Sequence, residues 1–187
     1  MGIIKMLPII RYLFASLCLC LITTSHAKEG VYTVTYVYDG DTVKLRPINS
    51  NSQKDEFKLR LTDIDAPERT QDYGLKSRRA LIKLCQGELS PSKGKKAVQL
   101  GVQDKKILVT AEIIAKDKYN RALGRLQCNH IDASLYLVEL GLAWYPNKYS
   151  NDREIYHAAL KARTKKRGLW TDDKPIPPWS WRREHLH

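Results

Sequence analysis

The chain has 187 residues and a formal net charge of +12 at pH 7, with 32 Lys and Arg against 20 Asp and Glu. Once any export segment is removed, this length fits one domain, and no internal repeat or long low-complexity tract appears, which excludes a repeat protein. The positive charge favours a polyanionic partner. Basic surfaces also occur on proteins without such a partner, so charge alone only favours nucleic acid.

Residues 1–27 have the features of a signal peptide. Lys5 and Arg11 supply positive charge, residues 12–22 are apolar, and Ser25-His26-Ala27 places small residues at the two positions that a signal peptidase inspects. The apolar run is shorter than the roughly 20 residues of a membrane span. We therefore expect cleavage after Ala27 and export to the periplasm or the medium, the alternative being an uncleaved membrane anchor.

Cleavage would remove Lys5 and Arg11 and lower the formal charge from +12 to +10. It would also leave two cysteines, Cys85 and Cys128. An even pair of cysteines in an exported protein predicts a disulfide, and the alternative is two buried free thiols.

Five segments have the alternating apolar and polar pattern of β-strands. Asp39-Gly40 is a turn signal between the first two. The residues from Gln86 to Lys106 contain Pro, Gly and several lysines, and they predict an irregular basic loop. The expected strands are Val31–Tyr38, Thr42–Arg46, Glu56–Thr62, Ile107–Ala115 and Ala122–Cys128.

Three segments are predicted to be helical. The first runs from Gly74 to Cys85 with a broad apolar stripe. The second has Asp132 as its expected N-cap and Gly141 at its end, and the third begins near Asn151 and continues towards Gly168. The fold class is therefore α+β: a five-stranded OB-fold β-barrel with three packed helices, spanning residues 28–172. We expect residues 173–187 to form an irregular C-terminal tail.

Acidic and basic residues cluster in three loops of this barrel. The first cluster is Asp39-Gly40-Asp41-Thr42, which taken alone is most simply a turn. The second places Arg60 just before three carboxylates within six positions, those of Asp63, Asp65 and Glu68. A hard divalent cation, which prefers oxygen ligands, would relieve the repulsion among these carboxylates. The third is the segment from Asp117 to Arg121, whose arginine is suited to bidentate phosphate binding, or which is an ordinary charged hairpin turn.

These motifs, in this order and spacing, resemble the staphylococcal nuclease (thermonuclease) family. The similarity extends to Glu139–Trp144 and Gly168–Trp170 and covers residues 31–170. It implies an OB-fold enzyme that uses Ca²⁺ to hydrolyse phosphodiester bonds in DNA and RNA, leaving 5′-hydroxyl and 3′-phosphate ends. Asn120 replaces a glycine of the family and is expected to keep the turn in the left-handed conformation.

The resemblance also implies a role for each matching position. Asp41 and Asp65 would hold the calcium ion, together with the backbone carbonyl of Ala66, where the best-known member has Thr. Glu68 would orient or deprotonate the attacking water. The phosphate-binding arginines would be Arg60 and Arg121, and the residues near a terminal phosphate of the nucleotide would be Lys118 and Tyr119. Cys85 and Cys128 would join the first helix to the fifth strand.

Two other functions would fit parts of the sequence. A non-catalytic nucleic-acid-binding module would use the same barrel, although such a module need not keep all five charged positions. An exported protein that binds envelope polyanions would explain only the charge and the signal segment. We expect DNA and RNA as substrates, no obligate protein partner, no lasting membrane anchor and a monomer.

Overall fold

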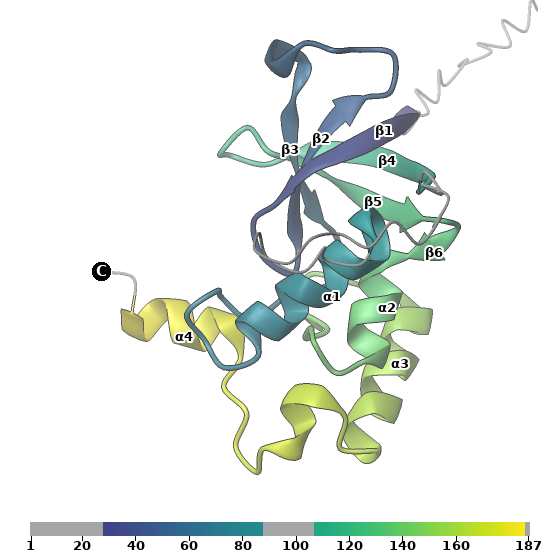
Figure 1. Cartoon of the computed structure of the whole chain (residues 1–187). Coiled ribbons are helices and arrows are strands. Elements are labelled where there is room, and N and C mark those ends of the chain that lie inside the picture. Colours follow the sequence, from purple (N-terminus) through teal and green to yellow (C-terminus); the bar gives the residue numbers. More distant parts are fainter. Residues whose placement is uncertain (1–27, 88–106, 186–187) are drawn as a thin grey trace, which may run out of the picture.

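The computed structural model describes residues 28–87 and 107–185. A closed barrel forms its upper half, and helices pack below it (Figure 1). The signal-peptide expectation and the lysines of the Gln86–Lys106 loop lie outside the described residues. Among the residues that are described, no helix is long and apolar enough to cross a membrane.

Five strands form the barrel, and their order is β3-β2-β1-β4-β5, with β6 added at the outer edge of β5. The barrel closes because β3 also pairs with β5 in parallel, so that Arg60 lies opposite Leu123. The predicted five-stranded barrel is therefore confirmed. The strands are β1 (Lys28–Val37), β2 (Thr42–Pro47), β3 (Phe57–Leu61), β4 (Val109–Lys116), β5 (Ala122–Cys128) and β6 (Ile131–Asp132).

Side chains that alternate along the strands fill the interior. Leu59 and Leu61 of β3 and Leu126 of β5 are almost fully buried, whereas Arg60 between the two leucines points outward. This period of two is the pattern that predicted the strands, because successive side chains leave opposite faces of a strand. Outward-pointing positions at one end of β3 and β5 are thus free to carry charge.

Helices cover one end of the barrel, and α2 and α3 have aspartate side chains as N-caps. The side chain of Asp132 accepts a hydrogen bond from the backbone N–H of Leu135, as predicted for an N-cap of α2 (Ala133–Glu139). The third helix begins one residue later than expected: Asp152, not Asn151, caps α3 (Arg153–Thr164) and accepts from Ile155 N–H at 3.0 Å. Asp152 also pairs with Arg125 of β5, which favours this choice of cap.

Helix α1 (Gly74–Gln86) is covalently joined to the barrel. Its Cys85 forms a disulfide with Cys128 at the end of β5, with Cα atoms 5.1 Å apart. Both cysteines are buried in the main core. The bridge links the helix to the strand that closes the barrel.

The expectation of an irregular tail is wrong for its last part. Pro178–His185 form a further helix, α4, after the 3₁₀ helix η2 (Gly168–Thr171). Pro178 occupies the first position of α4. The backbone N–H at this position has no partner within the helix, so proline, which has no N–H, costs no hydrogen bond there. The described part of the chain therefore holds four α-helices, not three, and α4 returns towards the barrel mouth (Figure 1).

Candidate active site

Asp41 sits at the start of β2, in a turn that packs tightly against α1. A side chain on Gly40 would meet the hydroxyl of Ser77 at 1.9 Å and the Cβ of Ala66 at 2.7 Å, so a residue larger than glycine does not fit between them. The amide of Asp41 donates to the Asp39 carboxylate at 3.0 Å. The Asp-Gly-Asp turn is therefore more than a hairpin signal, because it buries Asp41 at the barrel mouth.

The register between β2 and β3 places Asp41 beside Arg60. Thr42 pairs with Arg60, and the carbonyl of Asp41 accepts from the amide of Leu61 at 2.8 Å. The Arg60 guanidinium donates one hydrogen bond to Asp41 Oδ1 and another, of 2.8 Å, to Asp65 Oδ1. One cationic group thus contacts both carboxylates that were expected to bind calcium.

Asp41 is only 2% exposed, and its carboxyl group has several polar partners. Burial raises its pKa to about 7, and Arg60 and the amide of Ala66 oppose that rise. That amide donates to Asp41 Oδ2 at 2.8 Å, and the Thr42 hydroxyl donates to Oδ1 at 2.9 Å. A buried carboxylate of this kind is stabilised by any cation that reaches it.

Asp65 is held from the opposite side by the segment that follows α2. Its amide and carbonyl exchange two backbone hydrogen bonds of 2.9 Å with Trp144. The loop before it is fixed by Asp63, which has a positive φ of 66° and accepts from Ser150 at 2.7 Å. The Asp65 side chain is therefore aimed by its backbone.

Glu68 lies in the next turn, close to the start of α1. Its amide donates to the side chain of Gln71 at 3.2 Å. The backbone is so near that a Cβ on Gly74 would lie 1.8 Å from the Glu68 carbonyl oxygen. Gln71 is buried and also donates to the carbonyl of Ile176 at 2.6 Å, which connects the Glu68 loop to the C-terminal segment.

Arg182 of α4 also binds this group of carboxylates, and sequence reasoning did not find it. Its guanidinium donates to Asp65 Oδ2 and to Glu68 Oε1, each at 2.7 Å, and to Asp65 Oδ1 at 3.1 Å. These hydrogen bonds raise the pKa of Arg182 above its usual value. Two features of the sequence indicate this helix. Pro178 is suited to the first position of a helix, and Trp179, Arg182 and Arg183 have the i, i+3 and i+4 spacing that puts them on one helix face.

Arg121 lies on the same outer face as Arg60, one strand away. Arg121 precedes β5 and lies two residues before Leu123, the partner of Arg60. The rise per residue and the spacing between strands therefore place the Cα atoms of Arg60 and Arg121 at a separation of about 8 Å. The Arg121 guanidinium donates to Asp117 Oδ2 at 2.7 Å. The structure thus brings both arginines to one end of β3 and β5, with Arg121 paired inside its own turn.

The turn between β4 and β5 has the conformation that the sequence predicted. Asn120 has a positive φ of 60°. Lys118 and Tyr119 project outward, and Tyr119 is 68% exposed. Burial pushes the pKa of Asp117 up, but hydrogen bonds from the Arg121 backbone and side chain outweigh it and leave the pKa lowered. Lys118 and Tyr119 stand at the surface, and the amide of Tyr119 donates to Asp117 Oδ1 at 2.9 Å.

The donor set at the barrel mouth fits a hard cation. The carboxylates of Asp41 and Asp65 both contact the Arg60 guanidinium, so their oxygens face the same space at the barrel mouth. Within residues 28–87 and 107–185, no cluster of three or more His, Cys, Asp or Glu side chains has a metal-binding arrangement. A cation here would complete its shell with backbone carbonyls, water and substrate oxygens, which calcium accepts readily.

Comparison with known proteins agrees with this geometry. Residues 58–172 match the family described as staphylococcal nuclease homologue. The chain belongs to the staphylococcal nuclease family. It is 31% identical to an uncharacterized endonuclease of Escherichia coli O157:H7 over 179 residues, which covers 95% of this chain and 97% of that protein.

Two further relatives show how widely the family extends. An uncharacterized endonuclease of Haemophilus influenzae is 31% identical and covers 84% of this chain and 75% of its own length. A staphylococcal-like nuclease of Arabidopsis thaliana is 30% identical over 68% of this chain and 34% of its own length.

The matched family region contains some parts of the site and omits others. Arg60, Asp65, Glu68 and Arg121 lie within residues 58–172. Helix α4, which carries Arg182, lies beyond the end of that region. Asp41 and strands β1 and β2 also lie outside that region, so the site combines residues from within the matched segment with residues on both sides of it.

Proposed function

We propose that the chain is an exported, calcium-dependent nuclease that hydrolyses phosphodiester bonds in DNA and RNA. Membership of the staphylococcal nuclease family makes it a nuclease with nucleic acid as substrate. The proposal adds three points to family membership: calcium as the ion, export of the protein, and products with 5′-hydroxyl and 3′-phosphate ends. The observation that carries the proposal is the convergence of Asp41 and Asp65 on the Arg60 guanidinium, with Glu68 on the same loop.

The difficulty of the reaction is electrostatic. A phosphodiester is an anion, and its pentacoordinate transition state is more negative, so preorganised positive charge accelerates the attack of water. Arg60 would exchange its contacts with Asp41 and Asp65 for the non-bridging phosphate oxygens and donate to them from one side. Arg121 would do so from the neighbouring strand, after exchanging Asp117 for the phosphate. The Cα atoms of these two arginines are about 8 Å apart, and arginine side chains are long enough for both guanidinium groups to meet on one phosphate.

Asp41, Asp65 and the Ala66 carbonyl would hold the ion, which when bound neutralises phosphate charge and polarises the phosphorus–oxygen bonds. Glu68 would take a proton from the attacking water. The water oxygen forms a bond to phosphorus, and the bond from phosphorus to the 5′ oxygen breaks. The fragment upstream then keeps a 3′-phosphate, and the leaving 5′ oxygen takes a proton from solvent water to become a hydroxyl.

Arg182 must release Glu68 before Glu68 can act as a base. In the described conformation Arg182 donates to both Glu68 and Asp65. A substrate phosphate offers the same guanidinium an oxygen acceptor of similar chemistry. Arrival of substrate would therefore free Glu68 at the moment when its carboxylate is needed.

A digestion assay tests the proposal directly. Purified protein is incubated with plasmid, single-stranded DNA and RNA in the presence of calcium, magnesium or a chelator. Calcium should support cleavage, and the chelator should abolish it. New 5′ ends should accept phosphate from a polynucleotide kinase without prior phosphatase treatment, as 5′-hydroxyls do.

Two matched variants complete the assay. Glu68→Gln should lose on the order of 10²-fold or more in rate, the scale of a positioned general base, while Glu112→Gln on the exposed face of β4 should keep full activity. Binding of nucleic acid without cleavage under every ion condition would instead favour the non-catalytic binding module. Localisation is tested separately, by fractionation and by sequencing the N-terminus of the mature protein.

A further inference from the structure

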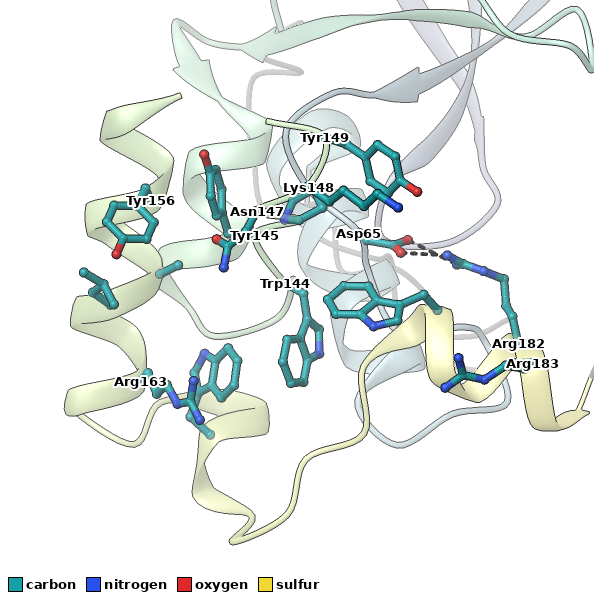
Figure 2. A pocket seen from close by; sticks show the side chains of 15 residues that line it. Asp65, Trp144, Tyr145, Asn147, Lys148, Tyr149, Tyr156, Arg163, Arg182 and Arg183 are labelled. Atoms are coloured by element: carbon teal, nitrogen blue, oxygen red, sulfur yellow. Dashed lines mark hydrogen bonds and ion pairs between the residues drawn. The ribbon is translucent and has the colours of Figure 1, made fainter. Parts of the chain in front are cut away.

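A pocket of about 710 Å³ opens next to Asp65, and it shares Asp65 and Arg182 with the site at the barrel mouth. Its walls come from the segment between α2 and α3, from α3 itself, from η2 and from α4. Figure 2 shows Lys148 and Tyr149 near Asp65, Arg182 reaching Asp65 from α4, and Arg163 at the far side. Lys118 and Tyr119 do not line it, so it is separate from the turn between β4 and β5.

Aromatic side chains form much of the pocket wall. Trp144 lies between Trp170 and Trp179, with ring centroids 4.5 Å and 5.5 Å away. Tyr149 is 81% exposed, and Trp179 is 41% exposed. Exposed aromatic faces of this kind are the surfaces on which unpaired bases stack.

The charged residues of the pocket are nearly all cations. Lys148, Arg163, Arg182 and Arg183 line it, and Asp65 is the acidic residue among the lining side chains. Arg163 lies over the Trp170 ring at 5.3 Å, which holds its guanidinium against the wall. Positive charge interleaved with aromatic rings suits an anion that carries a planar group, and a nucleotide has both.

The position of the pocket relates it to the site of hydrolysis. Asp65 belongs both to the cation-binding pair and to the pocket lining. A strand whose phosphate lies between Arg60 and Arg121 therefore has its neighbouring nucleotide within reach of the opening. The volume falls in the range of about 300–1,000 Å³ that small-ligand sites occupy, which accommodates a nucleotide.

We propose that this pocket binds a nucleotide adjoining the scissile phosphate, with its base unstacked against Trp179 and Tyr149 and its phosphate held by Arg183. This inference rests on the proposed nuclease function and names the part of the substrate that α4 recognises. Trp179 and Arg183 come from α4, which lies beyond the matched family region, whereas Tyr149 lies within it. A base can enter only when it is unpaired, so the pocket selects single-stranded segments.

The first test measures binding without turnover. A fluorescently labelled single-stranded hexanucleotide is titrated with the protein in the presence of a chelator, so that hydrolysis does not contribute. Trp179→Ala and Arg183→Ala should each weaken binding about 10-fold, the scale of losing one stacked base or one phosphate contact. Arg153→Ala, an exposed arginine of α3 that does not line the pocket, is the matched control and should bind as the wild type does.

The second test measures turnover with calcium. Trp179→Ala and Arg183→Ala should raise KM for the hexanucleotide about 10-fold and change kcat little. A second substrate lacks one base, that of a nucleotide next to the cleaved bond. The wild type should bind this substrate as weakly as the Trp179→Ala variant binds the intact hexanucleotide. Trp179→Phe keeps an aromatic face and should restore most of the binding. Arg182 is left intact, because it contacts Asp65 and Glu68.

The outcomes separate the two proposals. Wild-type affinity and KM in both folded variants, checked by thermal unfolding, would overturn the subsite even if the enzyme cleaves well. Absence of cleavage under all ion conditions would overturn the nuclease function, while the chelator titration would still decide whether the pocket takes a nucleotide. Equal loss of binding in Arg153→Ala would show a general charge effect and would also overturn the subsite.

Discussion

Asp65 and Trp144 exchange two backbone hydrogen bonds, each 2.9 Å long, between segments almost eighty positions apart. This isolated bridge joins the loop that carries Asp65 to the segment after α2. Trp144 in turn packs against Trp170 and Trp179. One contact therefore joins the expected cation site to the aromatic pocket.

Replacing Arg60 should damage catalysis most clearly. Arg60→Ala removes a positioned guanidinium and should lower kcat/KM on the order of 10²-fold or more. Arg60→Lys keeps the charge but loses the fork that contacts Asp41 and Asp65 together, so it should recover only part of the rate. Steady-state cleavage of a labelled oligonucleotide measures both, and wild-type rates in Arg60→Ala would remove this arginine from the mechanism.

Replacing Arg121 should lower the rate about as much as replacing Arg60, whereas replacing its ion-pair partner Asp117 should not. Arg121→Ala is expected to lose on the order of 10²-fold or more in rate. Asp117→Asn should have a much smaller effect, because it takes away the carboxylate that Arg121 must leave in order to bind phosphate. The comparison is made on one substrate at fixed calcium. An Asp117→Asn enzyme as impaired as Arg121→Ala would indicate that the turn itself is needed.

Calcium should stabilise the folded protein through Asp41. The Asp41 carboxyl is buried, so an ion that contacts it in the native state raises the unfolding temperature as the calcium concentration rises. Asp41→Asn should lose most of this calcium-dependent rise, whereas Asp152→Asn, away from the barrel mouth, should retain it. Thermal unfolding with calcium and with chelator provides the measurement, and an unchanged rise in Asp41→Asn would exclude Asp41 as a ligand.

The Cys85–Cys128 disulfide should contribute substantially to stability. It closes a loop with a sequence separation of 43, for which chain entropy predicts about 4 kcal/mol. The double variant Cys85→Ala, Cys128→Ala should have a free energy of unfolding that is lower by an amount of that order. Its unfolding midpoint should therefore fall at a lower denaturant concentration. Mass spectrometry of non-reduced peptides should find the two cysteines linked. Free thiols at both positions would contradict the bridge.

The N-cap of α3 should give the protein a dependence on acid pH. The amide of Ile155 and the Arg125 guanidinium hold the pKa of Asp152 below its usual 3.8. A lowered folded pKa means that its stabilisation is present above about pH 4 and is lost as the pH falls through the folded pKa. Asp152→Asn keeps a good cap but loses the ion pair with Arg125.

Urea unfolding at several pH values checks this expectation. The wild type should be more stable than Asp152→Asn at pH 7, and the difference should shrink as the pH falls below about 4. Asp152→Ala, which also loses the cap, should be less stable by about 1 kcal/mol more at every pH. A difference between the wild type and Asp152→Asn that stays constant down to low pH would show that the charge of Asp152 is unimportant.

The sequence by itself determined the barrel and the residues at its mouth. Alternation along the strands, Asp132 as a cap and the left-handed Asn120 are local properties, and they were predicted correctly because neighbouring residues decide them. The order and spacing of the motifs around Asp41, Arg60 and Asp65 identified the family, since a shared fold preserves those positions in the chain.

Only the tertiary structure decided how distant segments meet. Local pattern suggested Asn151 as the third cap, but the ion pair between Asp152 and Arg125 of another element favours the next residue. Helix α4 looked irregular because its Pro and Trp residues have weak helical signals, and its docking depends on Trp144 and on the carboxylates of Asp65 and Glu68. The contacts of Arg182 join residues more than a hundred positions apart, and no local pattern encodes them.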